Sequence, residues 1–260
     1  MRPSIFLDTG VIKACLDTRL MLLPECKKIM WAGHEIEATV HRPVYINQNL
    51  YFLRQGNRAR FEDTVALRFI AALAKEGKIE LQMQGEVFHE LMGLPGAMDD
   101  SPLFHGAPIT TVAGPVQYGR IVADGFGTDY QYEFLVSLTH SRFQALQKVC
   151  GAFQGHGRPL HRNQLIDAFH VWCAESSRAT YFLTHDDKLV SALNRAKTPS
   201  TSVIPITPKR VLVALVSSHP TWIWSVLREA WRQRRSSRDL FHPAQCASEE
   251  FHSGKRPPGF

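Results

Sequence analysis

Short apolar segments alternate with longer amphipathic segments along this chain. The short segments are too brief for helices and predict buried strands; they cover residues 4–7, 78–83, 179–187 and 201–206. The longer segments repeat their apolar positions at helical spacing; the helices expected from them cover residues 11–16, 61–75, 85–93, 129–150, 163–177, 188–196 and 209–217. Strands that alternate with helices favour a parallel sheet. We therefore expect an α/β fold with a central parallel β-sheet, helices on both faces and three α/β/α layers.

Two stretches interrupt this alternation. Residues 24–55 alternate only weakly and contain proline, which predicts an irregular or edge hairpin. Residues 95–127 are rich in glycine and proline and predict a long loop or insertion, a type of segment that is often functional. We expect one domain with insertions, then a basic helix and a disordered tail. Their residues are 1–217 for the domain, about 17–60 and 95–127 for its insertions, 218–235 for the helix and 236–260 for the tail.

The composition narrows the class of protein. Hydrophobic residues make up 44% and charged residues 21%, as in soluble globular proteins. No apolar run reaches the roughly 20 residues that span a bilayer, and no signal peptide is recognisable, so we expect a cytoplasmic protein with no membrane partner. The five cysteines are widely spaced and favour neither a disulfide framework nor a cysteine zinc site. The net charge is +6, and a basic stretch over residues 228–238 is typical of nucleic-acid binding or of a solvated helix face.

Candidate chemistry lies in acidic residues beside the predicted strands. Asp8 closes the first strand, and Asp186 and Asp187 close the strand over 179–187. Because sites gather at the carboxyl ends of parallel strands, we expect these side chains at one edge of the sheet. Asp8 and Asp186 could instead cap the helices that follow them.

Two predicted helices add further carboxylates to this edge. Glu86 and Glu90 lie one turn apart on the helix after the second strand, so either one could take part. Asn163 is expected to cap the helix over 163–177, which places Asp167 in its first turn, where the helix dipole alone could also favour it. The histidines His161, His170 and His185 are left out, because a lone histidine is more often structural than a ligand.

Four converging carboxylates need a cation. At a separation of about 5 Å, each pair repels by about 3 kcal/mol at an effective dielectric of 20. Hard oxygen ligands of this kind select Mg²⁺ or Mn²⁺, which keep bound waters and meet substrate phosphates. The acidic set therefore predicts a divalent-metal site.

In the order and spacing of these segments the chain resembles the PIN-domain nucleases. The resemblance runs through "IFLDTGVI", "GEVFHEL", "NQLIDAFHVWCAE" and "TYFLTHDDKL" and covers roughly the first 215 residues. The family has an Asp-Thr or Asp-Ser step after the first strand, a Glu on a helix, an Asp opening a later helix and a Thr-x-Asp closing a strand. The matching positions are Asp8, Glu90, Asp167 and Asp186, the last two being 19 positions apart.

The resemblance implies a PIN-like fold and a metal-dependent endoribonuclease. Asp8, Glu90, Asp167 and Asp186 would be catalytic residues and ligands of Mg²⁺ or Mn²⁺, and a bound ion would activate water against an RNA phosphodiester. Asp187 would be an optional further ligand, or would replace Asp186. Hydroxyl groups beside the ligands would orient ligands or water; these belong to Thr9 and Thr184.

The chain also departs from the family pattern. Gly10 stands where Asn or Ser is usual, and the 82 positions between Asp8 and Glu90 exceed the gap in compact members. A toxin-like role is a candidate, but the small toxins of toxin–antitoxin pairs are about half as long as this chain. The length therefore speaks against that role and not against the fold. Besides RNA, we keep a protein inhibitor or antitoxin and a second copy in a homodimer as candidate partners.

Two other functions stay open. One is a catalytically weak PIN-like scaffold that binds RNA or a protein partner, which the loss of a polar side chain at Gly10 favours. The other is an aspartic protease, since "DTG" at residues 8–10 is its triplet. That class needs two such triplets and an all-β fold, whereas this chain has one triplet and many helices.

Overall fold

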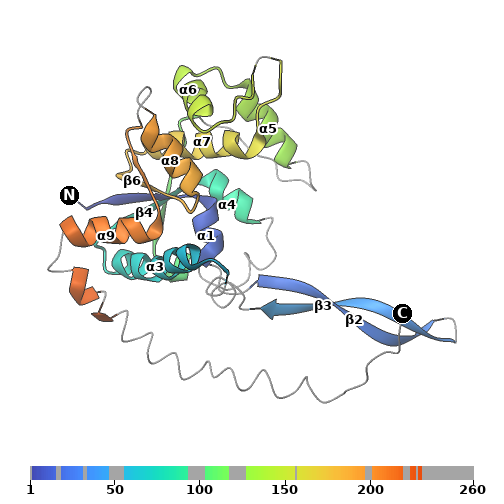
Figure 1. Ribbon diagram of the computed structural model, residues 1–260. Coiled ribbons are helices and arrows are strands. Elements are labelled where there is room, and N and C mark those ends of the chain that lie inside the picture. Colours follow the sequence, from blue (N-terminus) through green and yellow to red (C-terminus); the bar gives the residue numbers. More distant parts are fainter. Residues whose placement is uncertain are drawn as a thin grey trace.

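The computed structural model describes residues 2–15, 19–31, 34–46, 56–92, 103–116, 127–155, 157–196, 201–218, 223–226 and 228–229. Within these residues a parallel sheet lies between two layers of helices (Figure 1). The α/β fold class with three α/β/α layers is therefore confirmed. None of the described helices is long and apolar enough to cross a membrane.

The central sheet contains five parallel strands in the order β5–β4–β1–β6–β7. They are β1 (Ser4–Leu7), β4 (Glu80–Gln84), β5 (Ile109–Val112), β6 (Tyr181–Leu183) and β7 (Ile204–Ile206). The chain passes from β1 outward through β4 and β5, and later fills the other side of β1 with β6 and β7. The strand order therefore reverses between β1 and β6, and a crevice for ligands is expected at the carboxyl ends of these two strands.

Both faces of the sheet are buried, which explains the continuous apolar runs in its strands. Ile5 and Leu7 of β1 point into one core, and Phe6 points into the other. Phe6 stacks on Phe182 of β6 with ring centroids 6.1 Å apart. These two strands, which carry the candidate site, are thus held firmly against each other.

Each core is covered by its own group of helices. The first layer consists of α1 (Thr9–Cys15), α3 (Arg58–Lys75), α4 (Gly85–Met92) and α9 (Pro208–Ser218). The second layer consists of α5 (Gly127–Ser137), α6 (Ser141–Val149), α7 (Arg162–Ser176) and α8 (Asp187–Arg195). Figure 1 shows α3 and α9 on one side of the sheet and α5, α6 and α7 on the other.

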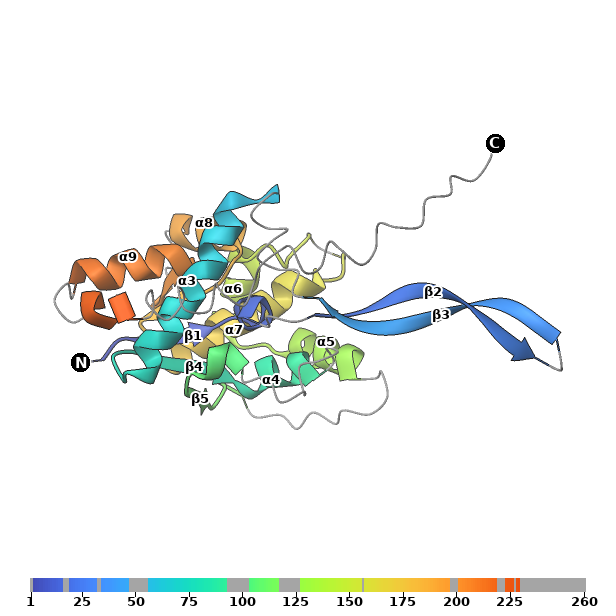
Figure 2. The same ribbon diagram turned by 90° about the horizontal axis from the view of Figure 1, so that it is seen from below.

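A long antiparallel hairpin extends away from the sheet (Figures 1 and 2). It consists of β2 (Arg19–Trp31) and β3 (His34–Ile46), and the pairing runs from Arg19 opposite Ile46 to Trp31 opposite His34. The expected hairpin over 24–55 is thus present, but it begins earlier and is regular; residues 47–55 lie outside the described residues. Its prolines are tolerated because each strand of a two-stranded ribbon has an open edge.

The prediction of a loop over residues 95–127 is wrong at the centre of that range. Ile109–Val112 forms β5 on β4, preceded by the short turn η1 (Leu103–Gly106). Thr110 and Thr111 of this edge strand are exposed, so it lacks the apolar signature of a buried strand. The parts at 95–102 and 117–126 lie outside the described residues.

Two helix predictions also need correction. The single helix over 129–150 is two helices, because α5 ends at Ser137 and α6 begins at Ser141, with His140 as its N-cap. The N-cap of α7 is His161, so Asn163 lies inside the helix, and Asp167 lies in its second turn rather than its first. Of the basic helix expected over 218–235, Ser218 is the last residue of α9, residues 223–226 and 228–229 are helical, and the others, like the tail, lie outside the described residues.

Candidate functional site

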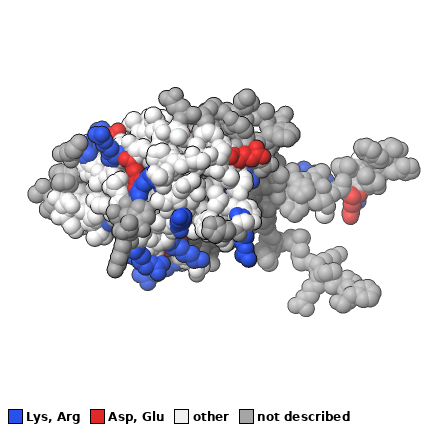
Figure 3. All heavy atoms as spheres, turned by 90° about the horizontal axis from the view of Figure 1, so that it is seen from above, with Lys and Arg blue, Asp and Glu red and all other residues white. Residues whose placement is uncertain are grey.

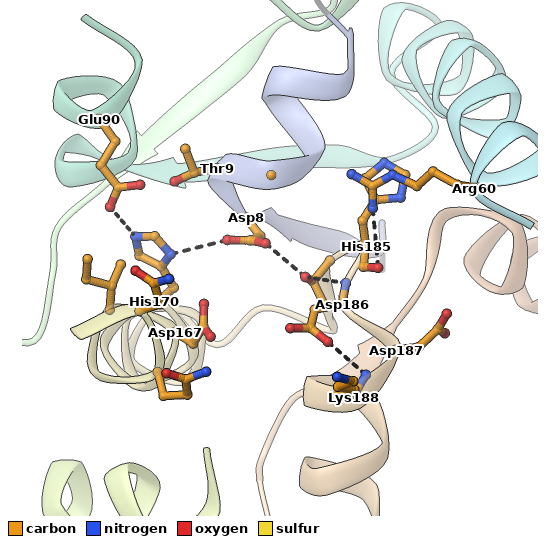
Figure 4. Close-up of a pocket in the computed structure, with 15 residues that line it drawn as sticks. Asp8, Thr9, Arg60, Glu90, Asp167, His170, His185, Asp186, Asp187 and Lys188 are labelled. Atoms are coloured by element: carbon orange, nitrogen blue, oxygen red, sulfur yellow. Dashed lines mark hydrogen bonds and ion pairs between the residues drawn. The ribbon is translucent and has the colours of Figure 1, made fainter. Parts of the chain in front are cut away.

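A pocket of about 700 Å³ opens at the carboxyl ends of β1 and β6, where the strand order reverses (Figure 4). Five segments of the chain supply its charged, histidine and threonine side chains. They are Asp8 and Thr9 from the end of β1 and the start of α1, Arg60 from α3, Glu90 from α4, Asp167 and His170 from α7, and Thr184, His185, Asp186, Asp187 and Lys188 from the end of β6 and the start of α8. The four predicted carboxylates and both predicted hydroxyls thus line one pocket.

Asp8 occupies the centre of this group. Its Oδ2 accepts a hydrogen bond of 2.8 Å from Thr184 Oγ1, and its Oδ1 lies 3.3 Å from His170 Nδ1. The first bonds of α1 come from the backbone, since Val11 N–H donates to the Asp8 carbonyl at 3.0 Å. Both carboxylate oxygens therefore face the pocket residues, and the alternative that the side chain caps α1 is not observed.

Asp186 does cap a helix. Its Oδ1 accepts hydrogen bonds from the N–H groups of Lys188 at 2.8 Å and Leu189 at 3.0 Å, at the start of α8. Its own N–H donates to Thr184 Oγ1 at 3.1 Å, so the buried Thr184 connects Asp186 to Asp8. The cap fixes the carboxylate and leaves Oδ2 without a hydrogen bond among the described residues. Asp187, the first residue of α8, is exposed at the pocket rim.

His170, which is not among the expected site residues, lines the same pocket and lies between Asp8 and Glu90. Its Nε2 lies 3.4 Å from Glu90 Oε1, and the ring is only 1% exposed. Burial lowers the pKa of His170, but the Glu90 charge and the Asp8 hydrogen bond outweigh it and raise the pKa to about 10. The ring is therefore a cation that joins two carboxylates. The sequence signal was its position three residues after Asp167, on the same face of α7.

Glu90, rather than Glu86, reaches the pocket. Glu86 is buried elsewhere and accepts a hydrogen bond of 2.8 Å from Gln131 Nε2 of α5. Burial raises the pKa of Glu90, but the charge and hydrogen bonding of His170, together with smaller contributions from other neighbours, outweigh it, so the pKa lies below its ordinary value. The hydroxyl of Thr9 lies beside Glu90 (Figure 4), and it is buried with no hydrogen-bond partner among the described residues.

Asp167 is the carboxylate that fits its surroundings least well as an anion. Burial, together with the charges of Asp8, Asp186 and Glu90, raises its pKa to about 7, while His170 opposes this only in part. A carboxylate that is half protonated near neutral pH would bind a cation readily, because the cation removes the repulsion that raises its pKa. A bound cation is therefore expected to lower the pKa of Asp167.

The pocket lining as a whole is short of positive charge. Five carboxylates face three cationic side chains, Arg60, His170 and Lys188. His185 adds no charge, because burial and the nearby Arg60 lower its pKa to about 3. Full ionisation of the five carboxylates would leave two negative charges unbalanced, which suits a divalent cation, and oxygen donors suit Mg²⁺ or Mn²⁺.

The carboxylates are not gathered around one point. In the described part of the chain, no three His, Cys, Asp or Glu side chains form a group that could hold a metal ion as they stand. Glu90 is drawn to His170 on one side, and Asp186 is fixed by its cap on the other. The donor set and charge thus fit a divalent ion, while binding one would require Asp8, Asp167 or Glu90 to turn within the pocket.

Gly10 gives Asp8 the room to turn. A Cβ atom at this position would lie 3.3 Å from Asp8 Oδ2, closer than most such contacts. A larger residue would press on the carboxylate that accepts the Thr184 hydrogen bond. Gly10 thus removes a polar side chain from the site and also leaves space beside the carboxylate of Asp8.

Replacing Asp167 with asparagine is expected to stabilise the metal-free protein more at pH 8 than at pH 5. The folded pKa of about 7 lies above the ordinary 3.8, so the wild-type protein loses stability as pH rises from about 4 through about 7. Asparagine does not titrate, so the stabilisation by Asp167→Asn should be larger at pH 8 than at pH 5 by roughly 2 kcal/mol. Urea unfolding in chelator measures it, with the exposed Glu133→Gln as control; an equal gain at both pH values would contradict the expectation.

The chain matches no known protein family, and no curated protein matches it.

Proposed function

We propose that this protein is a divalent-metal-dependent endoribonuclease that hydrolyses RNA phosphodiester bonds. The observation that carries the proposal is the set of carboxylates from β1, α4, α7 and α8 that line one pocket at the reversal of the strand order, with more negative charge than the protein balances. The resemblance of these segments to PIN-domain nucleases supports the same reaction class.

Under this proposal, each side chain of the pocket has a role that follows from its position. Asp8, Asp167 and Asp186 would hold Mg²⁺ or Mn²⁺, with Glu90 as a further ligand and Asp187 as an optional one. When bound, the ion supplies an activated water and stabilises charge on the phosphate. Thr184 holds Asp8 and the Asp186 backbone in place, and the buried hydroxyl of Thr9, beside Glu90, would orient a ligand or a water.

The surface supports an RNA partner. On the face seen in Figure 3, Lys and Arg cover more of the surface than Asp and Glu do, among a larger area of uncharged residues. A second groove, between α6 and α8, is lined by Lys148 and Arg195 with no acidic side chain among its lining residues. Positive charge on a protein surface attracts a polyanion such as RNA. A protein inhibitor of the antitoxin type and a second copy in a homodimer remain candidate partners.

Metal removal tests the proposed reaction. Labelled single-stranded RNA should be cleaved in Mn²⁺ or Mg²⁺ and should stay intact in excess chelator, because the carboxylates alone supply no activated water. Glu133→Gln, on the exposed face of α5, should cleave like the wild type. Cleavage that persists in chelator, or an absence of cleavage in either metal, would contradict a metal-dependent nuclease.

A scaffold that binds RNA or protein without cleaving it is the second candidate. It is favoured by His170, which already pairs with Asp8 and Glu90 in the place where a cation could act. RNA binding that is the same with and without metal, and that is unchanged in Asp8→Asn, would support this scaffold.

A further inference from the structure

Arg60 lies on the opposite side of the pocket from His170 and Glu90 (Figure 4). It is the third residue of α3, and its side chain is partly buried. Its Nη1 donates a hydrogen bond of 3.3 Å to the backbone carbonyl of His185, just after β6. This bond holds the guanidinium against the strand end that carries Asp186.

The guanidinium is attracted by the charges of Asp63 and of the pocket residues Asp8, Asp186 and Asp187, but it forms a direct ion pair with none of them. Among the described residues no carboxylate lies within ion-pair distance of it, and its one side-chain hydrogen bond uses a single donor of five. Asp63, three residues further along α3, accepts the Lys209 N–H at 2.8 Å. Its neighbour Arg58 differs, because it is exposed and pairs with Glu62 at 3.0 Å. Arg60 therefore presents unused donors to the pocket.

The position of Arg60 near the N-terminus of α3 further disfavours its positive charge. The first turn of α3 contains no acidic residue, although the helix dipole favours negative charge there. Two arginines, Arg58 and Arg60, occupy this turn instead. A cation at a helix N-terminus, partly desolvated and without an ion pair, is stabilised when an anion binds beside it.

We propose that Arg60 binds a phosphate group of the RNA strand next to the scissile one, through the planar fork of its guanidinium. The pocket would then have an acidic half for the metal ion and a basic edge that fixes the strand. A guanidinium meets phosphate oxygens in a bidentate manner. The identity of the anion as RNA rests on the proposed function.

Binding of a short fluorescent single-stranded RNA, measured by anisotropy in chelator, tests the subsite without cleavage. Arg60→Gln is expected to weaken binding by about tenfold, because it removes charge-assisted hydrogen bonds to the phosphate. The slope of affinity against salt should fall by about 0.7 for the lost phosphate contact. Arg58→Gln removes the same charge two residues away and should change affinity by less than about twofold.

Arg60→Lys covers the case in which Arg60→Gln fails to fold. It keeps the charge but not the fork, so it should keep the salt slope and lose affinity several-fold. Equal RNA affinity in Arg60→Gln and Arg58→Gln, or wild-type affinity in Arg60→Lys, would overturn the subsite. A weakened Arg60→Gln in a protein that never cleaves RNA would uphold the anion subsite while rejecting the nuclease, so the two failures are distinguishable.

Discussion

Replacing Asp8 with asparagine is expected to reduce metal-dependent RNA cleavage by roughly a thousandfold or more, equivalent to several kcal/mol in the barrier. Asp8 is central because Thr184 and His170 contact its two oxygens and because it follows the central strand β1. Asparagine has nearly the same shape, but it lacks the negative charge that would hold the ion. Initial cleavage rates at saturating Mn²⁺ measure the effect.

Two controls separate this loss of charge from a loss of fold. Asp8→Asn should keep the wild-type circular dichroism spectrum, and Glu133→Gln should keep the wild-type rate, because Glu133 lies on α5 and outside the pocket lining. A folded Asp8→Asn protein that cleaves RNA within about tenfold of the wild-type rate would remove Asp8 from the reaction, since tenfold corresponds to only about 1.4 kcal/mol.

Replacing His170 with alanine is expected to destabilise the metal-free protein by about 3–5 kcal/mol, which is the typical cost of removing one partner of a buried ion pair. The ring lies between Asp8 and Glu90 and is fully buried, so its loss leaves two carboxylates facing each other. Urea unfolding in chelator measures the change. Mn²⁺ should restore more stability to His170→Ala than to the wild type, because the ion can replace the lost positive charge.

The stabilisation that His170 provides is expected to decrease as the pH rises. The folded pKa of His170, about 10, lies above the ordinary 6.5, so its stabilisation is complete below about pH 6.5 and is lost as pH rises through 10. The cost of His170→Ala should therefore be larger at pH 6 than at pH 9.5. A cost of less than about 1 kcal/mol at pH 6 would show that the ring does not act as the shared cation.

The sequence predicts the inner strands and the central part of the site well, because both depend on local patterns. Ser4–Leu7 is confirmed as β1, since a strand that is buried on both faces needs an unbroken apolar run. Asp8 and Asp186 follow from this, because a polar residue directly after such a strand lies at the edge of the sheet. The edge strand β5 was missed because its exposed threonines remove that pattern.

The remaining parts of the site depend on contacts between distant segments. Glu86 and Glu90 share a helix face in sequence, and the contacts of Glu86 with Gln131 of α5 and of Glu90 with His170 of α7 separate them. The role of His170 depends on carboxylates from β1 and α4, and that of Arg60 on a carbonyl after β6. No local pattern in the sequence contains these pairs.

A crystal soaked in Mn²⁺ and measured for anomalous scattering tests most directly whether the acidic pocket holds a divalent ion. A peak is expected in the pocket, bounded by oxygen atoms of Asp8, Asp167 and Asp186, and it should be absent from crystals of Asp8→Asn. A pocket without a peak at saturating Mn²⁺, with His170 still joining Asp8 to Glu90, would contradict the metal site and the nuclease proposed from it.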